Sequence, residues 1–286
     1  MRRHPIFRAL SHAANLLTIT AVLLVFYGAV WEFSTAEYLK GFSDAVLPQS
    51  GTAQQKVQSI LAWMEHGPAR EPDAANATVV PRDPEESLDH RGLLQVCGTA
   101  TNAFVNLARA GGIPSRRLLL LGADGQTRHV VAEVLIDGRW VVVDPVFRKI
   151  MTDDSGRLLT REDLKNPGVL LIATRGLTGY SPEYSYERTE YVRIEAIPLV
   201  GAFLRNALDR LYPDWEVSPS WTLVTERQSF LVLLTGAVLL IVSLLLLSAI
   251  KAYGVSRIGA EVLTPRGYLK LGVAALFQNL HPGSEY

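Results

Sequence analysis

The chain of 286 residues has 28 Lys and Arg against 28 Asp and Glu, so its formal net charge is zero. This balance lacks the basic excess that binds phosphate backbones, and we expect no nucleic-acid partner. Hydrophobic residues make up 48% of the chain and its mean hydropathy is +0.16. These values are high for a purely water-soluble domain, and they favour a folded domain combined with membrane segments.

Two uncharged apolar runs account for the high content of hydrophobic residues. Residues 230–250 are long enough to cross about 30 Å of hydrocarbon, and residues 16–31, extended by residues 13–15, reach the roughly 19 residues that also suffice. We therefore predict transmembrane helices at residues 13–31 and 229–250. The first run has an alternative interpretation as a cleavable signal peptide, with Arg2, Arg3 and Arg8 before it and Ser34-Thr35-Ala36 after it. Trp31 suits a membrane interface and favours an uncleaved helix.

Charge bias predicts the orientation of these segments. Three arginines and no acid precede the first run, and the tail after the second has more basic than acidic residues. Because positive flanks stay in the cytoplasm, we expect residues 1–12 and 251–286 inside a bacterial-type inner membrane and residues 32–228 in the periplasm or outside the cell. In the tail, apolar residues spaced along residues 269–280 predict an interfacial or partner-docking helix, with a partly ordered tail as the alternative.

The central region reads as one domain of helices followed by strands. Val57, Ile60, Leu61 and Met64 share one helical face, and Gly67-Pro68 ends that helix. A second helix is expected from about Cys97 to Arg109, where Gly111-Gly112 follow. Three strands follow in the segments RRLLLLG, RHVVAEVLI and RWVVVDP, the last two joined by a two-residue Asp-Gly turn. Short helices are expected after Thr160 and over residues 200–211.

Cys97 is the only cysteine in the chain and stands where the second helix begins. A helix N-terminus favours an anion, so it lowers the pKa of a thiol and makes the nucleophilic thiolate. Such a residue can also be a small buried hydrophobe, which is the usual role of a free cysteine. The position by itself leaves both interpretations open.

The predicted hairpin brings two further polar residues together. A turn at Asp137-Gly138 pairs Ile136 with Arg139 and Glu133 with Val142. His129 and Asp144 then lie on one face as diagonal neighbours, with Cα atoms about 7–8 Å apart. A carboxylate there can orient an imidazole, so Cys97, His129 and Asp144 form a candidate nucleophile, base and orienting acid. Alternatively, His129 is an edge histidine and Asp144 a turn residue.

The same residues resemble a known family. The segments QVCGTATNAFVNLARAGGIPSRRLLLL and RHVVAEVLIDGRWVVVDPVF are similar to the transglutaminase-like superfamily. The matching positions are Cys97, Arg109, Gly112, Ile113, Pro114, Arg116, His129, Glu133, Gly138, Trp140, Asp144 and Pro145. The resemblance implies an α+β, papain-like fold in which a helix bearing the cysteine packs on an antiparallel β-sheet. It also implies that Cys97 is the nucleophile, His129 the general base and acid, and Asp144 the orienting residue.

Two residues depart from the family pattern. Gln95 stands where the family usually has glycine, and Gly98 stands where it often has a bulky or acidic residue. Both belong to the rim of the expected site. Gln95 either helps to form an oxyanion hole or caps the turn before the helix.

We therefore expect a membrane-anchored cysteine peptidase, amidase or acyltransferase that acts on a protein or peptide outside the inner membrane. The alternative is a catalytically silent transglutaminase-like scaffold or binding module in a cell-envelope assembly. Glu133 is expected to brace an arginine. No metal-ligand spacing or phosphate-binding glycine loop stands out, so we expect no metal and no cofactor.

Overall fold

A computed structural model describes residues 5–67, 83–193, 201–213, 215 and 226–258. The chain divides into two compact units, one of residues 33–228 and one of residues 1–32 together with 229–286. The amphipathic segment expected over residues 269–280 lies outside the described residues.

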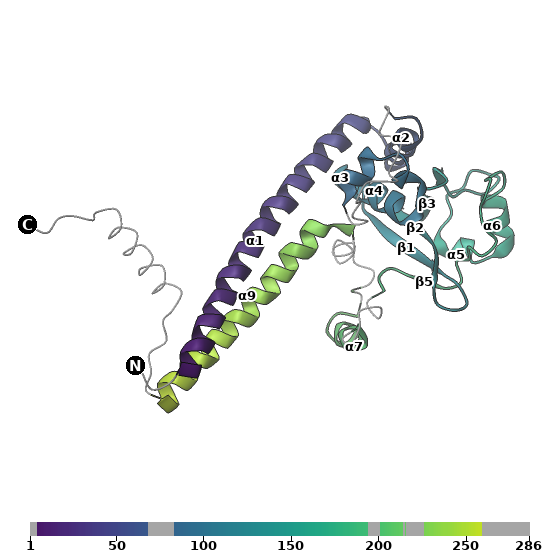
Figure 1. Ribbon diagram of the computed structural model, residues 1–286. Helices are drawn as coiled ribbons and strands as arrows, with labels where there is room; N and C mark the ends of the chain where they lie inside the picture. Colours follow the sequence, from purple (N-terminus) through teal and green to yellow (C-terminus); the bar gives the residue numbers. More distant parts are fainter. Residues whose placement is uncertain (1–4, 68–82, 194–200, 214, 216–225, 259–286) are drawn as a thin grey trace, which may run out of the picture. The chain divides into compact units, whose positions relative to one another are not determined.

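The larger unit contains a five-stranded antiparallel sheet with the order β4-β3-β2-β1-β5 (Figure 1). The strands are β1 (Ser115–Leu121), β2 (Thr127–Ile136), β3 (Arg139–Asp144), β4 (Lys149–Ile150) and β5 (Thr189–Glu190). The three long strands are those that the sequence predicts. The two short strands were not predicted, because two residues are too few to show an alternating pattern. Mixed helix and antiparallel sheet confirm the expected α+β class.

The turn between β2 and β3 is a two-residue hairpin turn. Asp137 has φ of 48° and Gly138 has φ of 76°. Positive φ at both residues is typical of a type I′ turn, whose twist matches that of the strands on either side. The observed pairs Ile136–Arg139 and Glu133–Val142 confirm the register predicted from the sequence.

Helices cover one face of this sheet. α4 (Cys97–Ala110) packs on β2 and β1, and it is buried continuously from Thr99 to Ala108. α2 (Ala53–His66) and α3 (Pro84–Asp89) pack around α4. The predicted apolar face of α2, formed by Val57, Ile60, Leu61 and Met64, is buried in the core. It joins Phe104 and Leu107 of α4 and Ala132, Val134 and Ile136 of β2. Burial of this apolar surface stabilises the unit.

A second apolar cluster covers the other face of the sheet. Leu118, Leu120, Val131 and Val142 pack there against Tyr186 and Trp215. Three further helices follow β4 in the chain: α5 (Arg161–Leu164), α6 (Pro167–Ala173) and α7 (Gly201–Leu211). Leu164 of α5, Ala173 of α6 and Leu208 of α7 all contact this cluster.

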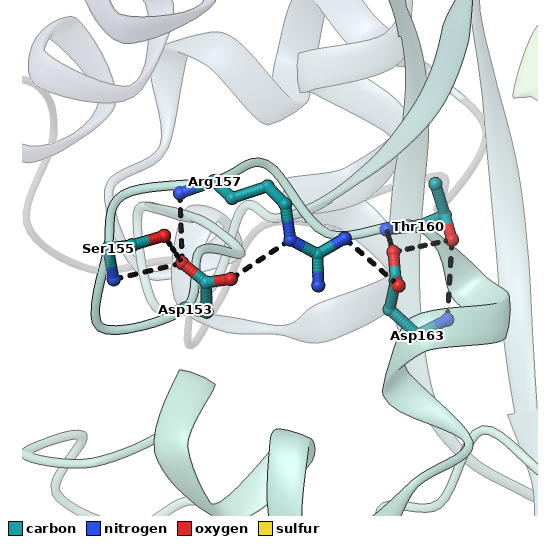
Figure 2. Close-up of polar contacts among 5 residues, drawn as sticks. All are labelled: Asp153, Ser155, Arg157, Thr160 and Asp163. Carbon is teal, nitrogen blue, oxygen red and sulfur yellow. Dashed lines mark hydrogen bonds and ion pairs between the residues drawn. The ribbon is translucent and has the colours of Figure 1, made fainter.

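A polar turn connects β4 to α5 (Figure 2). Asp153 accepts hydrogen bonds from the Ser155 hydroxyl at 2.6 Å and from Arg157, and these contacts hold its pKa at about 2. Arg157 also reaches Asp163 at 3.2 Å. Thr160 and Asp163 form a capping box at the start of α5, which confirms the helix start predicted there.

The C-terminal half of α4 is tied to both ends of the larger unit. Ser43 donates a hydrogen bond to the Leu107 carbonyl at 3.3 Å. The Arg227 Nε donates to Asn106 Oδ1 at 2.6 Å, and Arg109 forms an ion pair with the fully buried Glu226. Residues at the N-terminal and C-terminal ends of the larger unit are thus both fixed to α4.

The smaller unit consists of parts of two long helices. α1 (Pro5–Val46) and α9 (Gln228–Tyr253), which is followed by one π-helical turn (Gly254–Ile258), are both long and apolar enough to cross a membrane. They flank the sheet-containing unit in the sequence and indicate membrane association. α1 extends beyond the predicted residues 13–31, because its last turns carry Leu39 and Phe42, which pack in the core of the larger unit.

Glycines allow the two helices to approach closely. A Cβ at Gly28 would lie 2.6 Å from the Leu233 backbone nitrogen, and one at Gly236 would lie 2.8 Å from the Val25 backbone nitrogen. These obstacles are backbone atoms, which cannot rotate away. Small residues at such positions let membrane helices pack backbone to backbone.

Replacing Gly236 by leucine should therefore force α1 and α9 apart. We expect overpacking to destabilise the protein by about 1–3 kcal/mol and to lower its thermal unfolding midpoint in detergent. Differential scanning fluorimetry measures this midpoint. Gly41→Leu is the control, because a Cβ at Gly41 meets no atom within 4 Å. Equal midpoints for the two variants would contradict the close approach.

Candidate active site

Cys97 is the first residue of α4, and its side chain is half-buried. Val96 precedes it as the N-cap and supplies no side-chain hydrogen bond. The first N–H groups of α4 therefore receive no such cap and remain available to an anion. Hydrogen bonds from the backbone at Val130 and Gly98 favour the thiolate of Cys97.

His129 and Asp144 meet on neighbouring strands. Nε2 of His129 lies 2.7 Å from Oδ2 of Asp144, and the side chains are 2% and 0% exposed. The other carboxylate oxygen of Asp144 accepts hydrogen bonds from the backbone N–H groups of Val146 and Phe147, at 3.1 and 3.3 Å. These contacts fix the carboxylate, and the carboxylate in turn fixes the imidazole ring.

The orientation of the ring leaves Nδ1 for Cys97. Among the described residues, Nδ1 makes no hydrogen bond of standard length and angle. The interaction with His129 is nevertheless the largest of the influences that lower the pKa of the Cys97 thiol below its ordinary value. Contacts between nucleophile and base are often loose in the absence of substrate.

The two pKa shifts favour a charged pair. Burial opposes protonation of His129, but the hydrogen bond with Asp144 and the interaction with Cys97 outweigh burial and raise the His129 pKa to about 9. The pKa of Cys97 is lowered. Both shifts act in the same direction, toward a Cys97 thiolate paired with a His129 imidazolium.

Thr101 holds α4 against the strand that bears His129. Its buried hydroxyl donates a hydrogen bond to the carbonyl of Val130 at 2.9 Å. Thr101 lies one helical turn after Cys97, so both residues face β2. Cys97 itself packs against Leu119, Leu121 and Val130. These contacts fix the distance between the helix start and the imidazole.

Three aromatic rings surround the imidazole. Tyr184 stacks on His129 with a centroid distance of 4.2 Å and an interplanar angle of 6°. Phe147 and Tyr180 form T-shaped contacts with the imidazole, with centroid distances of 6.0 and 6.2 Å. An aromatic face favours a cation, and the cluster keeps water from the His129–Asp144 hydrogen bond. The sequence shows three tyrosines in the segment GYSPEYSY, but no spacing rule connects this loop to a histidine fifty residues earlier.

The rim of the site is open beside Cys97. Gln95 is exposed at the end of a short 3₁₀ turn (Leu93–Gln95). A Cβ added to Gly98 would meet no atom within 4 Å, so this glycine leaves free space beside the thiol. Arg148 supports the turn by donating a hydrogen bond to the Leu94 carbonyl at 3.1 Å, a contact that the sequence did not predict.

Glu133 lies on the same strand as His129 but has a different environment. It pairs with Arg116 at 2.7 Å and accepts a hydrogen bond from the Tyr191 hydroxyl at 2.9 Å. The Arg116 guanidinium also lies over the ring of Trp140 at 3.9 Å. Glu133 is buried and satisfied, which confirms that it braces an arginine. The described residues hold no group of three or more metal-ligating side chains.

Comparison with known proteins shows a family similarity within this unit. Residues 40–145 match the family model of the transglutaminase-like superfamily, and this region contains Cys97, His129 and Asp144. No curated protein sequence matches the chain. One similar solved structure, named as a candidate protease from Parabacteroides distasonis, is 17% identical with a TM-score of 0.30. The match covers 46% of this chain and 26% of that one.

The charged pair predicts an unusual pH profile for thiol alkylation. In the unmodified chain, the lowered pKa of Cys97 should make the reaction with iodoacetamide at pH 7 faster than that of a cysteine with an ordinary pKa. Asp144→Asn removes the negative charge beside His129, so the imidazolium and thiolate should both become less stable. We expect the rate at pH 7 to fall about tenfold, as for a thiol pKa raised by about one unit.

Asp153→Asn is the control for this experiment, because Asp153 lies in the turn of Figure 2 and its hydrogen-bond partners lie in that turn. Its alkylation profile should match that of the unmodified chain. An Asp144→Asn variant that keeps its thermal midpoint and the full rate at pH 7 would rule out the charged pair.

Proposed function

We propose that this chain, whose residues 40–145 form a transglutaminase-like core, is a membrane-anchored thiol enzyme that acts on amide bonds of a protein or peptide. The observation that carries the proposal is the hydrogen bond of 2.7 Å between His129 and Asp144 beside the Cys97 thiol. A nucleophile, a base and an orienting acid in this arrangement form the group that activates a thiol.

In the proposed reaction, the Cys97 thiolate attacks the amide carbonyl carbon and an S–C bond forms. The C–N bond then breaks as the His129 imidazolium gives its Nδ1 proton to the leaving nitrogen. The product is a thioester on Cys97 and a free amine. Water makes the enzyme a peptidase or amidase, and a second amine makes it an acyltransferase. In both cases His129 takes a proton from the attacking molecule, whose oxygen or nitrogen bonds to the carbonyl carbon while the S–C bond breaks, and the Cys97 thiolate and His129 imidazolium are restored.

The surrounding residues support these steps in distinct ways. Asp144 holds the imidazole so that Nδ1 faces the thiol, and it stabilises the imidazolium. The Cys97 backbone N–H lies at the start of α4, where it can stabilise the oxyanion, and the exposed Gln95 side chain is a second donor for that role. Gly98 leaves room for substrate on the rim.

A second candidate function is a silent scaffold or binding module in an envelope assembly. Two observations favour it. Gln95 and Gly98 depart from the family pattern beside the thiol, and the His129 side chain is 2% exposed under the Tyr184 ring. A substrate would have to reach Nδ1 from the side of Cys97 instead of through the tyrosines.

A thiol-directed peptide chloromethyl ketone separates the two functions. For an enzyme, the probe should label Cys97 much faster than it labels free cysteine, and His129→Ala should lower the rate at least tenfold by raising the thiol pKa. Mass spectrometry of the labelled chain measures both rates. His90→Ala is the matched control and should label normally. If the probe labels Cys97 no faster than free cysteine, and His129→Ala does not change that rate, the result would favour the scaffold.

We propose that residues 32–228 face the periplasm or the outside and that both termini are cytoplasmic, as the basic flanks predict. Cys97 is the only cysteine, so a membrane-impermeant methanethiosulfonate reagent should label intact cells through it. A Cys97→Ser/Ser284→Cys double variant, with its thiol in the tail, should be labelled only after the cells are opened. The reverse pattern would overturn this orientation.

A further inference from the structure

α7 exposes the apolar side of an amphipathic helix. Phe203 and Leu211, two turns apart on one face, are 76% and 82% exposed, and Leu204 and Tyr212 are exposed beside them. Arg210 is also exposed and borders this stripe. Burial of apolar residues is the rule for a helix packed on a domain, so an outward-facing apolar stripe indicates that another surface covers it.

The side of α7 that bears Arg205 and Asp209 is fixed to the domain, and Leu208 lies between this side and the exposed apolar side. Leu208 packs against the cluster on the outer face of the sheet, where Trp215 is 1% exposed. The Trp215 indole donates a hydrogen bond to Asp209 at 2.9 Å, and the Arg205 guanidinium lies 5.9 Å from the same ring. These contacts set the rotation of the helix, so the outward direction of Phe203 and Leu211 follows from packing.

The exposed apolar surface is concentrated at this helix. In the described part of residues 33–228, the large apolar side chains that are exposed are Phe33, Tyr38, Val96, Leu171, Phe203, Leu204, Leu211 and Tyr212. Half of them belong to α7 or to the residue after it. The remaining four are spread over α1, the rim beside Cys97 and α6.

The chain itself supplies a surface of matching chemistry. Both ends of the larger unit continue into helices that can span a membrane, and α9 begins at Gln228, soon after α7 in the sequence. Glu226 and Arg227 are held on α4, and α9 begins at the next residue, Gln228, so no flexible linker separates the fixed segment from the apolar helix. A domain tethered at both ends meets the bilayer at a high effective concentration, and a weak interfacial affinity is enough for binding.

We propose that α7 lies in the headgroup region of the membrane that α1 and α9 span, with Phe203, Leu204 and Leu211 toward the acyl chains. The apolar side chains enter the boundary between headgroups and acyl chains. Arg210 is placed to reach anionic phosphates, and Tyr212 has the amphipathic ring favoured at the interface. The contact is independent of the proposed catalysis and holds the domain in one orientation to the bilayer.

Lipid quenching of a fluorescent label tests this contact in the full chain. Cys97→Ser provides a chain without cysteine, into which Phe203→Cys or Ala202→Cys places a single label. The two adjacent positions are about 100° apart around the helix, so they form a matched pair. The labelled chains are reconstituted in vesicles of phosphatidylethanolamine and phosphatidylglycerol that contain lipids with a doxyl group near the headgroup.

We expect the lipid to quench the label at position 203 severalfold more than the label at position 202, and aqueous iodide to do the reverse. Leu211→Asp should reduce lipid quenching at position 203, because a carboxylate in the stripe opposes insertion. Equal lipid quenching at the two positions would overturn the proposal. A second result would also overturn it: a label at position 203 that neither quencher reaches, together with a disulfide between the introduced cysteines at position 203 of two unlabelled chains. That result would show that a second copy of the chain covers the stripe.

Discussion

The geometry of the site depends on the two-residue turn at Asp137 and Gly138. Both residues have positive φ, and this turn sets which residues of β2 and β3 lie opposite each other. A slip of one residue would turn Asp144 to the other face of the sheet, away from His129. The carboxylate would then leave the imidazole unsupported in a buried place, and the charged pair with Cys97 would lose its basis.

A second constraint sets the position of α4, which is held at three levels. Thr101 donates a hydrogen bond to the Val130 carbonyl, beside His129. Asn106 accepts a hydrogen bond from Arg227, and Arg109 forms an ion pair with Glu226. The first contact fixes the thiol relative to the base, and the other two connect the same rigid helix to the residues just before α9. The thiol and the segment just before α9 therefore both contact one close-packed helix. The proposed seating of α7 in the interface would add a third attachment of the domain.

Several features could be predicted from the sequence because they depend on local chemistry. The uncharged runs, the apolar face of α2, the start of α4 at Cys97 and the Asp-Gly hairpin each follow from patterns within a few residues. The hairpin also predicts the approach of His129 to Asp144, since both residues belong to one local unit. The match over residues 40–145 agrees with the family inferred from the same segments.

The tertiary structure alone decided the contacts that join distant segments. The stacking of Tyr184 on His129, the support of the Leu94 carbonyl by Arg148 and the pairing of Glu226 with Arg109 have no periodic signal, because each depends on how separate loops pack. The outward direction of the apolar side of α7 is of the same kind. Its sequence predicts a helix over residues 200–211, but only the contacts of Arg205 and Asp209 with Trp215 show that Phe203 and Leu211 face away from the core. The sequence determines which residues can share a face, and tertiary packing determines what that face meets.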